Sequence, residues 1–166
     1  MFKLREWRTS DKESLAANAN NINIWNNLRD YFPHPYTISD AEAYIGMVTG
    51  KPHPAINFTI DINGKASGGI GLVMQQDVER ITAEIGYWLG EEFWGKGIMT
   101  GAVKQMAAYS FDNFPLQKLF APVFGFNTAS MKVLEKAGFE KEALLKQGAI
   151  KNQKIIDLHY YSLFRK

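Results

Sequence analysis

The sequence predicts an α/β fold of the α+β type: a twisted, mostly antiparallel sheet of six or seven strands with helices on both faces. Three features predict it. Roughly the first 50 residues carry mostly helical signals, residues 58–89 alternate as an antiparallel strand series, and the remainder alternates strands with two amphipathic helices. The 166 residues fit a single domain, residues 1–166.

Helical signals dominate the N-terminal part of the chain, after a short alternating strand. Thr9-Ser10-Asp11 supplies side chains that cap the N-terminus of a helix. Pro33 and Pro35 interrupt helical structure, and Ser39 or Asp40 is expected to cap the helix that follows. The predicted elements here are a strand at residues 2–5, a helix that follows residues 9–11 and runs to about residue 20, and helices at about 22–28 and 39–48.

Strand signals dominate the middle of the chain. Asn63-Gly64, which follows an alternating segment, is typical of a two-residue hairpin turn. A long helix is predicted next, because apolar residues recur every three or four positions from Ile98 to Tyr109, and Gly138 ends a later, shorter helix. The predicted elements are strands at 58–62, 67–74 and 80–89, a helix at 97–111, a strand at 118–123, a helix at 128–136, and strands at about 139–146 and 155–164.

The composition excludes several classes of protein. The 19 Lys and Arg nearly balance the 17 Asp and Glu and are scattered, so no basic surface for nucleic acid or an anionic membrane is expected. The chain has no cysteine, which excludes disulfides and thiolate chemistry, and its three histidines are isolated, so no metal is expected. Because the N-terminus lacks an apolar targeting stretch and no span of about 20 apolar residues occurs, we expect a cytoplasmic protein.

The most informative segment is residues 85–100, where a strand leads through a glycine turn into a helix. Such a turn presents free backbone N–H groups and the positive end of a helix dipole, which together bind phosphate or pyrophosphate. The dinucleotide fingerprint G-x-G-x-x-G fits poorly, because Gly95, Gly97 and Gly101 are spaced G-x-G-x-x-x-G. A P-loop also fails, since Gly97 stands where a magnesium-binding hydroxyl is needed.

The segment resembles the phosphate-binding loop of the GNAT superfamily of acetyl-CoA-dependent acetyltransferases, in particular its Rim-type branch, which acetylates protein N-termini. The family loop reads [Q/R]-x-x-G-x-[G/A]. Residues 94–99, W-G-K-G-I-M, match its central glycine and depart at both flanking positions, as W-G-K-G does in the Rim-type branch. Residues 4–11, 32–42, 84–89 and 127–139 also resemble family segments in the right order, the last matching N-x-x-S-x-x-x-L-E-K-x-G-F.

The resemblance implies acetyl-CoA as cosubstrate, no metal, and direct attack of an amine on the thioester in a ternary complex. It also implies that the fourth and fifth strands splay apart at a bulge, with the pantetheine arm between residues 87–89 and 120–123. Lys96 would add a charge to the pyrophosphate site or simply be solvated. The cofactor-binding residues implied are Tyr87, Trp88, Leu89, Trp94, Gly95, Lys96, Gly97, Ile98, Met99, Thr100 and Asn127.

The attacking amine must lose a proton, so a base is needed near the acetyl group. Glu84 is the candidate, because strand alternation places it on the same face as Gly86 and Trp88, beside the expected gap and partly removed from water. The alternative is structural: a carboxylate paired with a neighbouring arginine such as Arg80.

Departure of the thiolate requires a proton or hydrogen-bond donor. Many members of the family use a tyrosine at a position that Leu134 occupies here, so the usual general acid is missing. Ser130, one helical turn earlier, or the Asn127 side chain is the candidate replacement. Ser130 could equally be a residue that only caps the helix.

The acceptor is expected to be a primary amine, bound by the helical N-terminal region. Candidate walls of its pocket are Tyr31, Phe32, His34 and Tyr36, with ordinary packing of a proline-rich turn as the alternative. A peptide N-terminal amine is favoured by the Rim-type resemblance. A small amine such as a polyamine or aminoglycoside, or a non-catalytic acetyl-CoA sensor, remains an alternative. No nucleic-acid or membrane partner is expected, and the chain is expected to be a monomer or homodimer.

Overall fold

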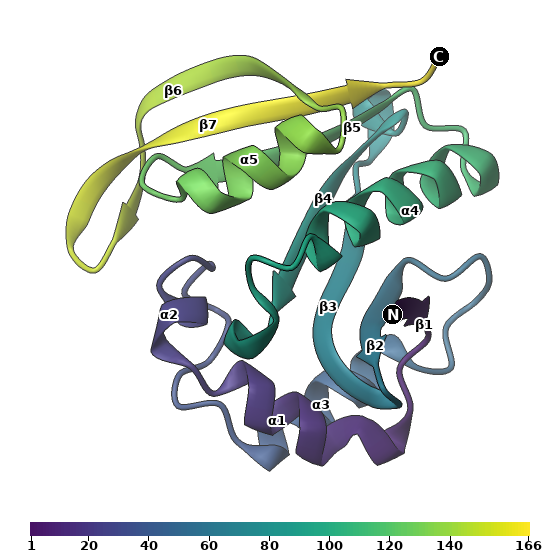
Figure 1. Ribbon diagram of the computed structural model, residues 1–166. Helices are drawn as coiled ribbons and strands as arrows, with labels where there is room; N and C mark the ends of the chain where they lie inside the picture. The colour runs from purple at the N-terminus through teal and green to yellow at the C-terminus, as the bar shows by residue number, and fades with distance from the viewer.

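The computed structural model describes all 166 residues and contains one seven-stranded sheet with the strand order β1-β2-β3-β4-β5-β7-β6 (Figure 1). Every neighbouring pair is antiparallel except β4 and β5, which run parallel. The predicted fold class is therefore confirmed. The strands are β1 (Phe2–Arg5), β2 (Asn57–Ile62), β3 (Lys65–Met74), β4 (Thr82–Leu89), β5 (Lys118–Phe124), β6 (Glu140–Lys151) and β7 (Lys154–Phe164).

Helices cover both faces of the sheet. In Figure 1 the helices α4 and α5 lie across one face, and α1 and α3 lie together beneath the β2–β3 end of the molecule. Two buried clusters correspond to these two layers. The helices are α1 (Lys12–Ala19), α2 (Ile22–Trp25), α3 (Ile38–Val48), α4 (Ile98–Asn113) and α5 (Thr128–Lys136).

Alternation along β4 directs its side chains into the two layers. Ile85 and Leu89 belong to the larger buried cluster, which also contains the buried residues of α4 and α5. Trp88 instead packs against the smaller cluster, formed by α1, α3 and Trp7. The period of two thus separates the face of β4 that carries Glu84 and Trp88 from the face that carries Tyr87.

Most predicted elements form where the sequence placed them, and the differences have local causes. Helix α3 is capped by Thr37 rather than by Ser39 or Asp40, because the Asp40 carboxylate returns to the Thr37 backbone N–H in a capping box. Helix α2 ends at Trp25, earlier than expected, and gives way to turns. Strands β6 and β7 form a longer hairpin than expected, with register shifts in β6.

The strands β4 and β5 separate along their length. They pair only from Thr82 opposite Lys118 to Glu84 opposite Phe120, whereas β4 stays paired with β3 up to Leu89 and β5 stays paired with β7 up to Phe124. The splayed pair expected from the resemblance is confirmed. The implied bulge is absent from the β3–β4 pairing, whose register is unbroken. Beyond Glu84 the facing edges of both strands are free of sheet partners.

No helix is long and apolar enough to cross a membrane.

Candidate active site

A cavity of about 1230 Å³ occupies the space opened by the separation of β4 and β5. Its walls come from the second half of both strands, the start of α4, one face of α5, the segment 27–33 after α2, and part of α3. Residues of both helical layers therefore line the cavity. The predicted site residues that line it are Tyr31, Phe32, Tyr36, Glu84, Tyr87, Trp88, Leu89, Trp94, Gly95, Gly97, Ile98, Met99, Thr100, Asn127 and Ser130.

The N-terminus of α4 forms one end of the cavity and presents a row of free donors. The six consecutive backbone N–H groups from Gly95 to Thr100 make no hydrogen bond to the protein, the first bond of the helix being that from Gly101 to Gly97. No acidic side chain lies in the first turn. Free N–H groups at the positive end of a 16-residue helix form a site for a phosphate or pyrophosphate group.

Glycine is required in this loop by its backbone conformation. Gly95 and Gly97 both have φ of +73°, in the left-handed region that other residues adopt only at a cost. A Cβ at either position would meet no atom within 4 Å, so space is not the constraint. The two glycines therefore set the path that turns the N–H groups in one direction.

Side chains of the preceding loop fasten it to its surroundings. The Trp94 indole Nε1 donates to the Leu89 carbonyl at 2.8 Å, which ties the loop to the end of β4. The Glu91 carboxylate accepts hydrogen bonds from Asn21 and Asn23 at the start of α2, and these lower its pKa. Lys96 is exposed, lies 5.7 Å over the Phe93 ring and does not line the cavity.

Glu84 lies at the last position of β4 that pairs with β5, where the two strands begin to separate. The Glu84 side chain is 17% exposed; its Oε2 accepts a hydrogen bond from Nη2 of Arg29 at 2.9 Å, and its Oε1 lies 2.7 Å from the same nitrogen. The hydrogen bond to Glu84 is the main reason that the pKa of Arg29 is raised. Arg80, the partner suggested from the sequence, instead donates to the Asp77 carbonyl. Glu84 is thus ion-paired through a residue distant in sequence, and it still faces the cavity.

The hydroxyl groups of Tyr87 and Ser130 lie next to each other on the side of β4 opposite Glu84. The Tyr87 hydroxyl lies 2.8 Å from the Ser130 Oγ, and either oxygen can donate. Burial raises the pKa of Tyr87, which keeps its phenol protonated. Asn127 caps α5 by accepting from the Ser130 N–H at 3.1 Å. Leu134 is fully buried in the core and does not line the cavity.

Aromatic side chains form the wall on the α1–α3 side. The Phe32 ring lies 5.0 Å from Tyr36 and 6.0 Å from Trp88 between ring centroids. Tyr36 is buried, whereas Tyr31 is 79% exposed. The ring of His34 packs 5.9 Å from Trp25, and His34 does not line the cavity. Of the four predicted acceptor residues, the structure brings three together and leaves His34 outside.

A buried cation completes this wall. The Lys151 side chain is 2% exposed; its Nζ bonds the Asp30 carboxylate at 2.7 Å and lies 3.5 Å from the centre of the Trp25 ring. At the same tip of the β6–β7 hairpin, Asn152 donates to the Asn26 side chain. These contacts hold the segment after α2 against the hairpin, about 120 residues away in sequence.

Three features of this cavity were missed by sequence reasoning: Arg29, the Lys151–Asp30 pair and the hydroxyl of Tyr87. Alternation along β4 signalled that Tyr87 faces away from Glu84, but only its neighbour Ser130 reveals a role for the phenol. Arg29 and Lys151 carry no local motif. Their positions follow from long-range packing of the segment after α2.

The sequence profile of the family described as "Acetyltransferase (GNAT) domain" matches residues 2–140. The "Putative ribosomal N-acetyltransferase YdaF" of Bacillus subtilis is 32% identical over 114 residues, which cover 64% of this chain and 62% of that protein. The "Spermidine N(1)-acetyltransferase" of Escherichia coli is 27% identical over 145 residues, covering 86% of this chain and 75% of that one. The matched parts span 39% to 62% of the first three curated relatives.

Among solved structures, the microcin C7 self immunity acetyltransferase MccE in complex with acetyl-CoA and AMP superimposes with a TM-score of 0.84 and 25% identity. The superposition covers 99% of this chain and 92% of that chain. The whole described chain therefore shares the architecture of an acetyltransferase that binds acetyl-CoA.

Proposed function

The chain belongs to the GNAT acetyltransferase family, and from that premise we propose that it transfers the acetyl group of acetyl-CoA to the N-terminal amine of a peptide. The observation that carries the proposal is the combination of the gap between β4 and β5 with the six free N–H groups at the start of α4. One feature accommodates an extended arm and the other a pyrophosphate, and both line a single cavity.

The cavity residues fit acetyl-CoA, which when bound supplies the acetyl group as a reactive thioester. The N–H groups of residues 95–100 would hold the pyrophosphate, as a helix N-terminus holds anions. The free edges of β4 and β5 beyond Glu84 would bond the amide groups of the arm, as a sheet edge bonds an added strand. Trp94 contributes by fixing the loop to β4.

Glu84 is proposed as the base that takes the proton from the acceptor ammonium. It lines the cavity where the strands separate, and its low exposure limits competition from water. Arg29 fixes its two oxygens through one nitrogen and so orients the carboxylate. A base in this place can act on the amine directly or through one ordered water.

Ser130 is proposed as the proton donor for the departing sulfur, together with Tyr87. Each lines the cavity on the side of β4 opposite Glu84, so the base and the donor lie on different sides of the strand. The raised pKa of Tyr87 keeps a proton available in the pair. Two hydroxyls in contact thus replace the tyrosine that the family carries where this chain has Leu134.

A peptide amine is favoured as acceptor because a relative that is 32% identical over 64% of this chain is named "Putative ribosomal N-acetyltransferase YdaF". The aromatic wall of Phe32, Tyr36 and Trp88 suits the apolar part of a first residue. A small amine is the second candidate, since a relative that aligns with 86% of this chain at 27% identity is named for spermidine.

The test measures CoA release from acetyl-CoA with a panel of short peptides and amines. We expect peptide-dependent release by the wild type. The Glu84→Gln variant should lose at least about 100-fold in kcat while keeping its acetyl-CoA affinity. Glu42→Gln is the matched control, because Glu42 also pairs with a cation, Lys12, but lies outside the cavity. Full turnover by Glu84→Gln would exclude Glu84 as the base, and acetyl-CoA binding without any turnover would favour a sensor.

A further inference from the structure

The Arg29 guanidinium lines the cavity with most of its hydrogen-bonding capacity unused. Its contacts with Glu84, a hydrogen bond to Oε2 and an ion-pair contact to Oε1, are both made by Nη2, which leaves the three N–H donors on Nε and Nη1. Nε and Nη1 make no hydrogen bond of ordinary length to the protein, although the neighbouring Tyr31 phenol adds a small part to the raised pKa. The side chain is 46% exposed, so three N–H donors of a permanent cation are available to a ligand.

The other charges of the acceptor side are already satisfied within the protein. Three carboxylates line the cavity: Asp30, Asp40 and Glu84. Asp30 is bonded by Lys151, and Glu84 by Arg29. Asp40 accepts from the backbone and hydroxyl of Thr37, which lowers its pKa. A polycation would find no unpartnered carboxylate here, whereas an anion would find the free edge of Arg29.

We propose that Arg29 determines acceptor specificity by binding an anionic group a few bonds away from the reacting amine. The inference rests on the proposed acetyl transfer and names the chemistry of its acceptor. The ammonium of such an acceptor faces Glu84, while its anionic group takes the Nε–Nη1 edge of the guanidinium. Planar guanidinium groups bind carboxylates through two parallel hydrogen bonds, which fixes position as well as charge.

The pairing of Arg29 with Glu84 places the group that would bind the acceptor's anion next to the group that would bind its ammonium. Nη2 lies 2.7 Å from Glu84 Oε1, so a group on the neighbouring edge of the same guanidinium lies within a few ångströms of an amine at Glu84. The acceptor's ammonium then lies beside the Glu84 carboxylate, and its anionic group lies beside the Arg29 guanidinium, so each charge faces one of opposite sign. The anionic group has two sources: the carboxylate of a free amino acid, or the side chain of an acidic first residue of a peptide.

The experiment compares acceptors that differ only in charge. Peptides with N-terminal Asp or Asn, C-terminally amidated, form one pair, and free glycine and glycinamide form the other. We expect kcat/KM of the wild type to favour the charged member of at least one pair by about tenfold to a hundredfold, the size expected of a charge-assisted hydrogen bond. A preference in the peptide pair identifies the side chain as the source, and one in the glycine pair identifies the amino acid.

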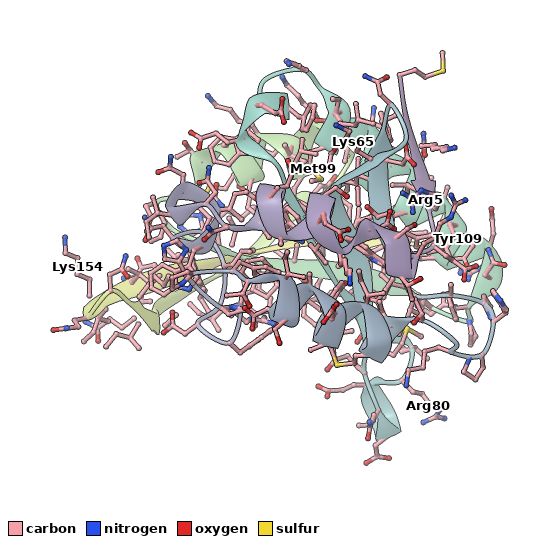
Figure 2. The ribbon with its side chains drawn as sticks, turned by 90° about the horizontal axis from the view of Figure 1, so that it is seen from below. Arg5, Lys65, Arg80, Met99, Tyr109 and Lys154 are labelled. Atoms are coloured by element: carbon pink, nitrogen blue, oxygen red, sulfur yellow. The ribbon has the colours of Figure 1, made fainter.

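The Arg29→Gln variant should remove this preference by raising KM for the charged acceptor more than for its neutral partner, while any loss of kcat from the released Glu84 carboxylate falls equally on both members of a pair. Arg80→Gln is the matched control, because Arg80 lies outside the cavity and projects at the outer edge of the molecule, as Figure 2 shows. The wild-type ratios test the proposal even if Arg29→Gln folds poorly. Ratios near one in both pairs, with measurable turnover, would overturn the role of Arg29 and leave acetyl transfer standing. No turnover with any amine would contradict the proposed function itself and this inference with it.

Discussion

Replacing Gly97 with alanine tests whether the start of α4 binds the phosphates of the cosubstrate. Gly97 has φ of +73°, and an added Cβ would meet no atom within 4 Å, so the substitution introduces backbone strain without a clash. Holding a residue with a Cβ in this region costs about 1–2 kcal/mol. Because the loop is exposed, the unliganded variant can relax, and binding must then restore the strained conformation.

The cost should therefore be measured as weaker binding. A free-energy loss of about 1–2 kcal/mol corresponds to a CoA affinity reduced about fivefold to thirtyfold in isothermal titration calorimetry. Gly50→Ala is the control, because Gly50 also has positive φ and open space around its Cβ but lies outside the cavity. It should lower the Tm and leave CoA affinity unchanged. Wild-type CoA affinity in Gly97→Ala would refute the assignment of the phosphates to these N–H groups.

Three further substitutions address the hydroxyl pair, the sheet and the gap. Ser130→Ala should reduce kcat about tenfold or more without weakening CoA binding, because it removes one of two O–H donors; equal losses in both would show a binding role instead. Burial raises the pKa of Asp61, but hydrogen bonds from Arg5 and the Gly64 N–H outweigh it and lower the pKa overall. The carboxylate therefore contributes its full stabilisation above its ordinary pKa of about 4 and loses it progressively as pH falls towards its lowered pKa, so denaturation should show Asp61→Asn about 3 kcal/mol less stable at pH 7 and a difference that narrows steadily below pH about 4; a difference independent of pH would contradict the ion pair. Gly86→Val should keep the Tm, since its Cβ meets no atom within 4 Å, yet reduce acceptor kcat/KM at least about tenfold by filling the cavity beside Glu84; unchanged turnover would place the acceptor elsewhere.

The elements that could be predicted are those whose signals are local. The Asn63-Gly64 turn joins β2 and β3 as expected, with both residues at positive φ. Helix α5 has its predicted bounds because Asn127 caps it and Gly138, at φ of +96°, follows its end. Capping and left-handed glycines act within a few residues, so a single sequence is enough to read them.

The parts that could not be predicted depend on contacts between distant segments. Helix α2 is short, and the segment after it is held by Lys151 and Asn152 on the β6–β7 hairpin, contacts that no local pattern encodes. The structural alternative for Glu84 named a nearby arginine such as Arg80 as its partner, but the partner is Arg29, 55 residues away in sequence. The position of Glu84 on its strand could be predicted from the local alternation, whereas its ion-pair partner could not be predicted from any local pattern.

The segment after α2 connects the parts of the site that act on different molecules. At the start of α2, Asn21 and Asn23 bond Glu91 in the loop that precedes α4, while in the segment after α2 Arg29 bonds Glu84 and Asp30 bonds Lys151. The unused N–H donors of Arg29, which line the cavity, therefore come from the segment after α2 and not from the sheet. Under the proposed function, substitutions at Arg29 would change which amine is accepted while β4 and α4 keep their geometry. Acceptor specificity and acetyl-CoA binding would then be carried by separate segments that meet at Glu84.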